Sequence, residues 1–130
     1  MNDICLVTWQ TEFAYDELQQ QFQQSAKFQN GILKEIDHPL REPPTGLMLL
    51  AKILEQNGYS VDIIDCMILE NPFAFFTKNA QKYRLFGFTS LTNTFPATIE
   101  LLQRVAQQNS EAYFVMGGPH VSFTYTDDLI

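Results

Sequence analysis

Four short apolar runs, rich in β-branched and aromatic residues, alternate along the chain with segments of helical periodicity. Runs of this length and composition are typical of strands that are buried on both faces of a sheet. Strands that alternate with amphipathic helices form right-handed βαβ units, so the pattern predicts a doubly wound parallel sheet in a three-layer α/β domain. The predicted strands are residues 4–8, 60–65, 85–90 and 112–116.

The clearest helical pattern lies between the first two of these strands. Two prolines, Pro43 and Pro44, suit the first turn of a helix, and Asn57-Gly58 suits its end. The apolar residues of this segment recur at the spacing of a single helix face. They are Leu47, Leu50, Ala51 and Leu54.

Two further helices are expected between the later strands. Residues 72–80 form a Phe-rich crossover, and Asn93 or Thr94 can cap the helix that follows. One face of that last helix carries Ile99, Leu102, Val105 and Ala106.

The long polar stretch after the first strand contains a weaker helical pattern. Residues 15–28 are rich in Gln and carry apolar side chains four residues apart. This spacing predicts a modest amphipathic helix that Asn30-Gly31 would end. Long excursions of this kind in compact domains are often functional.

Charge and cysteine content exclude several classes of function. The chain has 130 residues, a single-domain length, and 8 Lys and Arg against 15 Asp and Glu give a net charge of -7. Nucleic acids and anionic membranes need a basic surface, so neither is an expected partner. Cys5 and Cys66 are too far apart for a C-x-x-C site or an iron–sulfur cluster. With no signal peptide and no long apolar stretch in the sequence, a reducing, cytoplasmic location is expected.

The last residues favour a sheet that is truncated after its fourth strand. A flavodoxin-like (Rossmann-like) sheet normally has five strands. Here residues 124–130 have the hydroxyl and acidic residues of a helix start, and the sequence then stops. We therefore expect residues 1–130 to be one α/β domain at the N-terminal end of a longer protein, although an exposed fourth strand is the alternative.

In such a sheet, ligands bind over the carboxyl ends of the strands at the point where the strand order reverses. Small and hydroxylic residues cluster after the third and fourth predicted strands, where they suit a ligand pressed close to the backbone. These clusters are Thr89-Ser90-Leu91-Thr92 and Gly117-Gly118-Pro119-His120.

Other ligand classes on this fold lack their motifs here. No G-x-G-x-x-G follows the first strand, and no P-loop is present. The aspartate that would end the third strand of a receiver domain is replaced by Thr89 and Ser90. A flavodoxin phosphate loop is also a poor match to the residues after Thr8.

One family matches the motifs in order. The opening Pro43-Pro44-Thr45-Gly46-Leu47, the Thr89-Ser90-Leu91 segment and Gly117-Gly118-Pro119-His120 together resemble the N-terminal cobalamin-binding domain of B12-dependent radical SAM proteins. The resemblance covers most of the chain from Pro43 onward and the first strand. Thr89 takes the serine position of the S-x-L motif that B12-dependent mutases and methionine synthase carry.

The resemblance also marks a departure at the cobalt ligand. Gly46 takes the last position of the D-x-H-x-x-G motif, which places Arg41 at the aspartate and Pro43 at the histidine. Proline cannot coordinate cobalt. The resemblance therefore implies a corrinoid that is bound without the usual histidine, a departure common in the radical SAM branch.

The function implied is that of a cobalamin-binding module of a radical SAM enzyme of methyltransferase type. S-adenosylmethionine and a 4Fe-4S cluster are expected only in a missing downstream radical SAM domain, so this chain alone is not expected to be catalytic. The alternative is a cofactor-free domain of the same ancestry that serves regulation or protein–protein contact. The expected cofactor-binding residues are Pro43, Pro44, Thr45, Gly46, Thr89, Ser90, Leu91, Thr92, Gly117, Gly118, Pro119 and His120.

Overall fold

The computed structural model describes residues 3–9, 26–29, 32–36, 44–90 and 94–118. Four of its strands form one sheet in which every neighbouring pair is parallel, in the spatial order β4-β1-β5-β6. The strands are β1 (Ile4–Trp9), β4 (Val61–Asp65), β5 (Leu85–Ser90) and β6 (Tyr113–Gly117). This order confirms the predicted flavodoxin-like, doubly wound topology, in which the winding direction reverses between β1 and β5.

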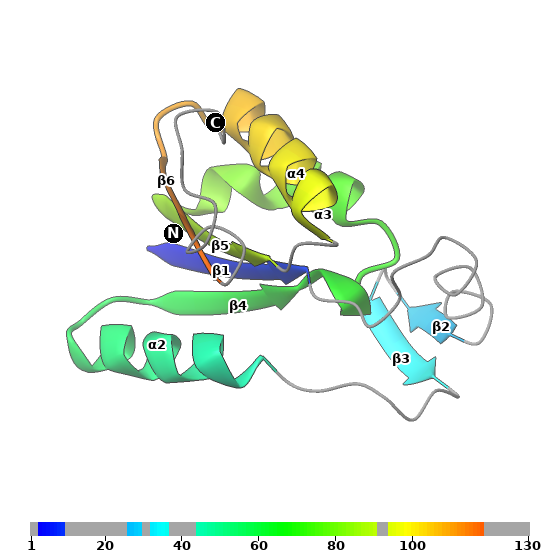
Figure 1. The fold of residues 1–130 in the computed structure, drawn as a ribbon, viewed down its shortest axis with the longest axis horizontal. Helices are drawn as coiled ribbons and strands as arrows, with labels where there is room; N and C mark the ends of the chain where they lie inside the picture. Colours follow the sequence, from blue (N-terminus) through cyan, green and yellow to red (C-terminus); the bar gives the residue numbers. More distant parts are fainter. Residues whose placement is uncertain (1–2, 10–25, 30–31, 37–43, 91–93, 119–130) are drawn as a thin grey trace.

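Helices cover both faces of the sheet (Figure 1). Helix α2 (Thr45–Gln56) lies on one face beside β4, and α3 (Pro72–Asn79) and α4 (Phe95–Gln108) lie together on the other. Short 3₁₀ turns, η1 (Cys66–Ile68) and η2 (Ala80–Lys82), follow β4 and α3. The three layers of the predicted α/β sandwich are therefore present.

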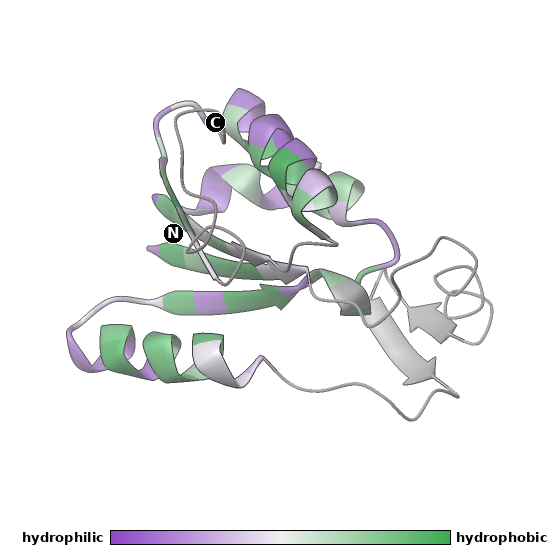
Figure 2. Cartoon of the chain, viewed as in Figure 1, coloured by the Kyte–Doolittle hydropathy of each residue, from purple (hydrophilic) through white to green (hydrophobic). Residues whose placement is uncertain are grey.

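The core is divided by the sheet because side chains alternate across each strand. On the side of α3 and α4, aromatic rings dominate: Phe76, Phe86 and Phe88 are buried in one cluster. On the side of α2, a smaller cluster holds Ile4 and Leu6 of β1. Figure 2 shows β1 largely in green, the colour of hydrophobic residues. Strand β1 contributes to both clusters, which confirms that it is buried on both faces.

Capping residues set the helix boundaries. Asn71 accepts a hydrogen bond from the Ala74 amide at 3.1 Å and so caps α3. After α2, Gly58 takes a φ of +91°, as the Asn57-Gly58 pair predicts for a helix end. After α4, the buried Asn109 amide donates to two backbone carbonyls near the start of β5, each at 2.9 Å. These bonds fix α4 against the α3–β5 connection.

The helix predicted over residues 15–28 is wrong at its C-terminal end. Ala26–Gln29 is strand β2, and it pairs antiparallel with β3 (Ile32–Ile36). An Asn-Gly pair between two short runs is also the strongest short-range hairpin signal, and the antiparallel pairing of β2 with β3 agrees with that alternative reading of the sequence. Residues 10–25, with the rest of the predicted helix, lie outside the described residues.

Two helix faces differ from their predictions. In α2, Leu47 and Ala51 are buried as expected, but Leu50 is 51% exposed. In α4, the buried face is centred on Leu101 and not on Ile99, a rotation of about one residue; its buried residues are Thr98, Leu101 and Val105. The fourth strand is also shifted by one residue, so that Gly117 ends the strand and does not merely follow it.

Candidate functional site

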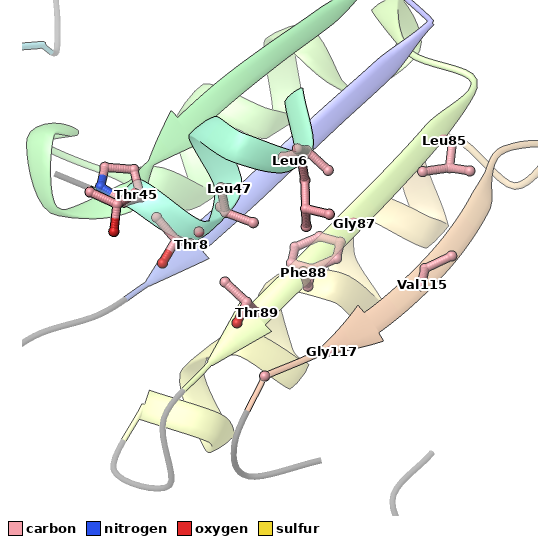
Figure 3. A pocket seen from close by; sticks show the side chains of 14 residues that line it. Leu6, Thr8, Thr45, Leu47, Leu85, Gly87, Phe88, Thr89, Val115 and Gly117 are labelled. Carbon is pink, nitrogen blue, oxygen red and sulfur yellow. The ribbon is translucent and has the colours of Figure 1, made fainter. Parts of the chain in front are cut away.

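A cavity of about 500 Å³ opens on the α2 side of the sheet (Figure 3). Its size is that of a small-molecule site. The start of α2 forms one wall, and β1, β5 and β6 form the floor, so the cavity lies over the point where the strand order reverses. Its described lining residues are Leu6, Thr8, Pro44, Thr45, Gly46, Leu47, Leu50, Leu85, Gly87, Phe88, Thr89, Val115, Gly117 and Gly118.

The two ends of the cavity differ in chemistry. Figure 3 shows the side chains of Thr8, Thr45 and Thr89 near the carboxyl ends of the strands, with Leu85 and Val115 toward the other end. None of the described lining residues is charged. These described lining residues offer no cation for a phosphate, and they suit a neutral, largely apolar group with a few hydrogen-bonding atoms.

Strand register brings the polar end together. Thr8 of β1 lies opposite Thr89 of β5, and Thr89 lies opposite Gly117 of β6. These three residues therefore form a row across the carboxyl edge of the sheet. The row joins segments that are more than 100 residues apart in the sequence, which is why spacing along the chain does not reveal it.

Two glycines leave room in the cavity that the protein itself does not fill. At Gly46 and Gly117, an added Cβ would meet no atom within 4 Å. Neither glycine is therefore required by close packing of the chain. Because both line the cavity, the absent side chains keep space open for a ligand.

Gly118 is held by a different constraint. Its φ is +99°, and an added Cβ would overlap the Thr89 hydroxyl and lie 3.1 Å from the Ser90 carbonyl oxygen. Only glycine adopts this conformation at no steric cost. The turn after β6 therefore passes directly over the end of β5.

Two hydroxyls are buried without a hydrogen-bond partner in the part of the chain that the structure describes. They are Oγ1 of Thr8 and Oγ of Ser90. Thr8 is 1% exposed and lines the cavity, whereas Ser90 is not among the lining residues. An orphaned buried hydroxyl costs about 1–3 kcal/mol, so the one beside the cavity is a candidate ligand contact.

The structure brings together half of the residues expected from the sequence to bind a cofactor. Those that line the cavity are Pro44, Thr45, Gly46, Thr89, Gly117 and Gly118. Ser90 precedes the loop but alternates away from Thr89, toward the face of α3 and α4. Pro43, Leu91, Thr92, Pro119 and His120 lie outside the described residues.

Sequence reasoning missed the floor of the cavity. Leu6, Thr8, Leu85, Gly87 and Val115 all lie on the strand face that Thr89 shares, but they read as ordinary core positions. The alternation of side chains could have identified Leu85, Gly87 and Val115, which lie two or four positions before Thr89 or Gly117. Leu6 and Thr8 follow only from the register of β1 with β5. Gly87 is the clearest of these residues as an indicator of the floor, because a Cβ at this position would approach Leu6 Cδ2 of the neighbouring strand to 2.9 Å.

The two thiols are not part of this site. Cys5 and Cys66 are free and buried, and burial raises the pKa of both well above its usual value. Within the described ranges, no group of three His, Cys, Asp or Glu side chains could hold a metal ion. None of the described helices is both long and apolar enough to cross a membrane.

A cavity at the switch point of a doubly wound sheet, with no charge among its described lining residues, is typical of a small-molecule-binding module of the flavodoxin-like class. The chain belongs to the B12-binding domain family, which it matches over residues 38–129. The cavity fits a cofactor of that kind, because its glycines leave space and its polar end has an orphaned hydroxyl. Family and cavity together support a cobalamin-binding module.

A relative adds a methyltransferase association. Over 84 residues, 63% of this chain, the sequence is 31% identical to an uncharacterized methyltransferase of Pyrococcus horikoshii. The alignment covers 18% of that protein, so this chain spans less than a fifth of the relative that it matches. No solved structure matches the chain at the same level of significance.

Proposed function

We propose that this chain is the corrinoid-holding module of a B12-dependent radical SAM enzyme of methyltransferase type. The observation that carries the proposal is the cavity at the switch point. Its described lining residues are uncharged, and it is open at two glycines and lined by hydroxyls at one end. The family match and the methyltransferase relative support the cofactor and the reaction class.

The cavity is suited to one part of the cofactor. A volume of about 500 Å³ fits the nucleotide tail of cobalamin, whereas the larger corrin ring would lie outside, over the carboxyl edge of the sheet. Leu6, Leu85 and Val115 would contact the apolar base, and Gly117 and Gly118 would allow the tail to pass close to the backbone. Residues of this chain would bind and orient the nucleotide tail and exclude water from it.

When bound, cobalamin supplies a cobalt-held methyl group for transfer, and that chemistry belongs to the cofactor. The role of the chain is to hold the ring in a fixed position relative to a catalytic domain. S-adenosylmethionine and a 4Fe-4S cluster would be held by a downstream domain. The low coverage of the relative is consistent with a longer parent protein.

The absence of a histidine ligand is the second part of the proposal. It rests on Pro43, which stands at the histidine position of the family motif. Electron paramagnetic resonance of the bound Co(II) form tests it. We expect cobalt lines without splitting by an axial nitrogen, and nitrogen splitting would contradict the proposal.

The radical SAM association has its own test. We expect the gene of the parent protein to encode a C-x-x-x-C-x-x-C run downstream of this domain, and the purified parent to bind iron and S-adenosylmethionine. A stop codon after Ile130 would contradict this part and leave cobalamin binding intact.

The alternative function is a cofactor-free domain used for regulation or protein contact. The observation that favours it is β6, which is an edge strand of the described sheet and carries the exposed side chains of Tyr113 (75%) and Val115 (55%). Exposed strand edges pair readily with other chains. A purified chain that binds no corrinoid but self-associates through this strand would favour the alternative.

A further inference from the structure

The Thr8 side chain is in an unusual position for a hydroxyl. It lies at the carboxyl end of β1, is 1% exposed and lines the cavity, and its Oγ1 has no partner among the described residues. Valine has the same shape and would occupy this position without an unsatisfied polar atom. A threonine here costs stability unless something outside the described chain accepts its hydrogen bond.

The neighbours of Thr8 define what that acceptor can be. The described cavity lining has no charged residue, and its floor is formed by Leu6, Leu85 and Val115. None of these described lining residues would compensate an ionised group for its lost hydration. A planar, neutral heterocycle with one unprotonated ring nitrogen fits both the apolar floor and the unpaired, buried hydroxyl of Thr8.

We propose that Thr8 is a specificity-determining residue whose hydroxyl donates a hydrogen bond to a ring nitrogen of the bound base. The inference rests on the proposed cobalamin function and deepens it. In a corrinoid bound without its own base on cobalt, the benzimidazole ring has a free nitrogen, which accepts this bond. Thr8 would thus select corrinoids whose lower base contains such a nitrogen.

Two corrinoids test this selection. Cobalamin has the ring nitrogen, whereas a cobamide with p-cresol as its lower base has an aromatic ring of related shape without one. One hydrogen bond from a buried hydroxyl corresponds to roughly a tenfold difference in affinity. We expect the full 130-residue chain to bind cobalamin about tenfold more tightly than the p-cresol cobamide in a fluorescence or absorbance titration.

Substitution of the residue separates its role from packing. Thr8→Val should lose about tenfold in cobalamin affinity and leave the affinity for the p-cresol cobamide unchanged. Thr8→Ser should retain the preference. Thr98→Val is the matched control: Thr98 is equally buried but lies on α4, where its hydroxyl donates to the Thr94 carbonyl at 2.9 Å. It should bind both corrinoids as the unmodified chain does.

The outcomes are distinguishable. If the unmodified chain binds neither corrinoid, the proposed function fails. If it binds both with equal affinity, or if Thr8→Val keeps the preference for cobalamin, the assignment of Thr8 is overturned while cobalamin binding stands. Circular dichroism of each variant shows whether it is folded, and the comparison within the unmodified chain needs no variant at all.

Discussion

At the scale of single residues, the site depends on side chains that are absent as much as on those that are present. Gly46 and Gly117 keep the cavity open, and Gly118 allows the turn after β6 to pass over Thr89. The sequence pointed to these three glycines through their family motif. It could not distinguish glycines that make room from the one that the backbone requires, because φ and neighbouring atoms are properties of the fold.

Substitution of Gly118 should combine backbone strain with a steric clash. Gly118→Ala forces a side chain into a positive φ and against the Thr89 hydroxyl, so we expect a loss of about 2 kcal/mol in the free energy of unfolding. Gly58→Ala is the control, because its φ is also positive but open space surrounds it. It should cost about 1 kcal/mol. Equal losses in denaturant unfolding would show that the clash with Thr89 is unimportant.

The buried thiols give a probe of the core. Because burial raises the pKa of Cys5 and Cys66, little thiolate forms near neutral pH. We expect neither thiol to react with a disulfide reagent such as DTNB in the native protein, and both to react in denaturant. Rapid reaction of either thiol under native conditions would contradict the burial of β1 or η1.

The carboxyl group of Asp3 links pH to stability. The Ser60 amide donates to Asp3 Oδ2 at 3.0 Å, and this bond, with smaller contributions from the Ser60 hydroxyl and Arg84, lowers the pKa of Asp3. Because its pKa is lower in the folded chain, the Asp3 carboxylate adds to the free energy of unfolding. This stabilisation is fully present above the ordinary pKa of 3.8 and is lost as the pH falls through the pKa of the folded state. The melting temperature of Asp3→Asn should therefore be lower than that of the unmodified chain at neutral pH, and the difference between the two should disappear in acid. A difference in melting temperature that does not change with pH would exclude a role of Asp3 ionisation in stability.

At the scale of elements, alternation of apolar runs with helical patterns was sufficient to predict the four parallel strands and three helices. The errors lie where two local signals compete. Residues 26–28 carried a weak helical spacing, yet they form β2 because the hairpin with β3 supplies a partner that spacing alone cannot show. Leu50 fits the apolar face of α2 by periodicity, but its side chain lines the cavity and is half exposed.

The first turn of α2 allows folding and binding to be separated. Gly46 is helical, an added Cβ meets open space, and most residues have higher helix propensity than glycine. Gly46→Leu should therefore keep the free energy of unfolding or raise it by up to about 1 kcal/mol. The larger side chain should fill part of the cavity and weaken corrinoid binding, as measured by retention of absorbance after desalting. Unchanged binding would show that the cavity is not the site, and Gly46→Ala tests a smaller obstruction.

At the scale of the whole molecule, the site follows from topology. The reversal of strand order between β1 and β5 places the carboxyl ends of both strands beside the start of α2, and β6 completes the floor. The sequence predicted this edge of the sheet and six of its described residues. It could not predict the apolar floor, because the residues that form it have the same composition as the rest of the core.

The central claim is that this chain holds a corrinoid in the cavity above β1, β5 and β6. The most direct measurement is incubation of the purified chain with hydroxocobalamin, followed by desalting and a visible absorbance spectrum. We predict that corrin absorbance stays with the protein at close to one cofactor per chain. Complete loss of corrin absorbance from the folded chain would contradict the account.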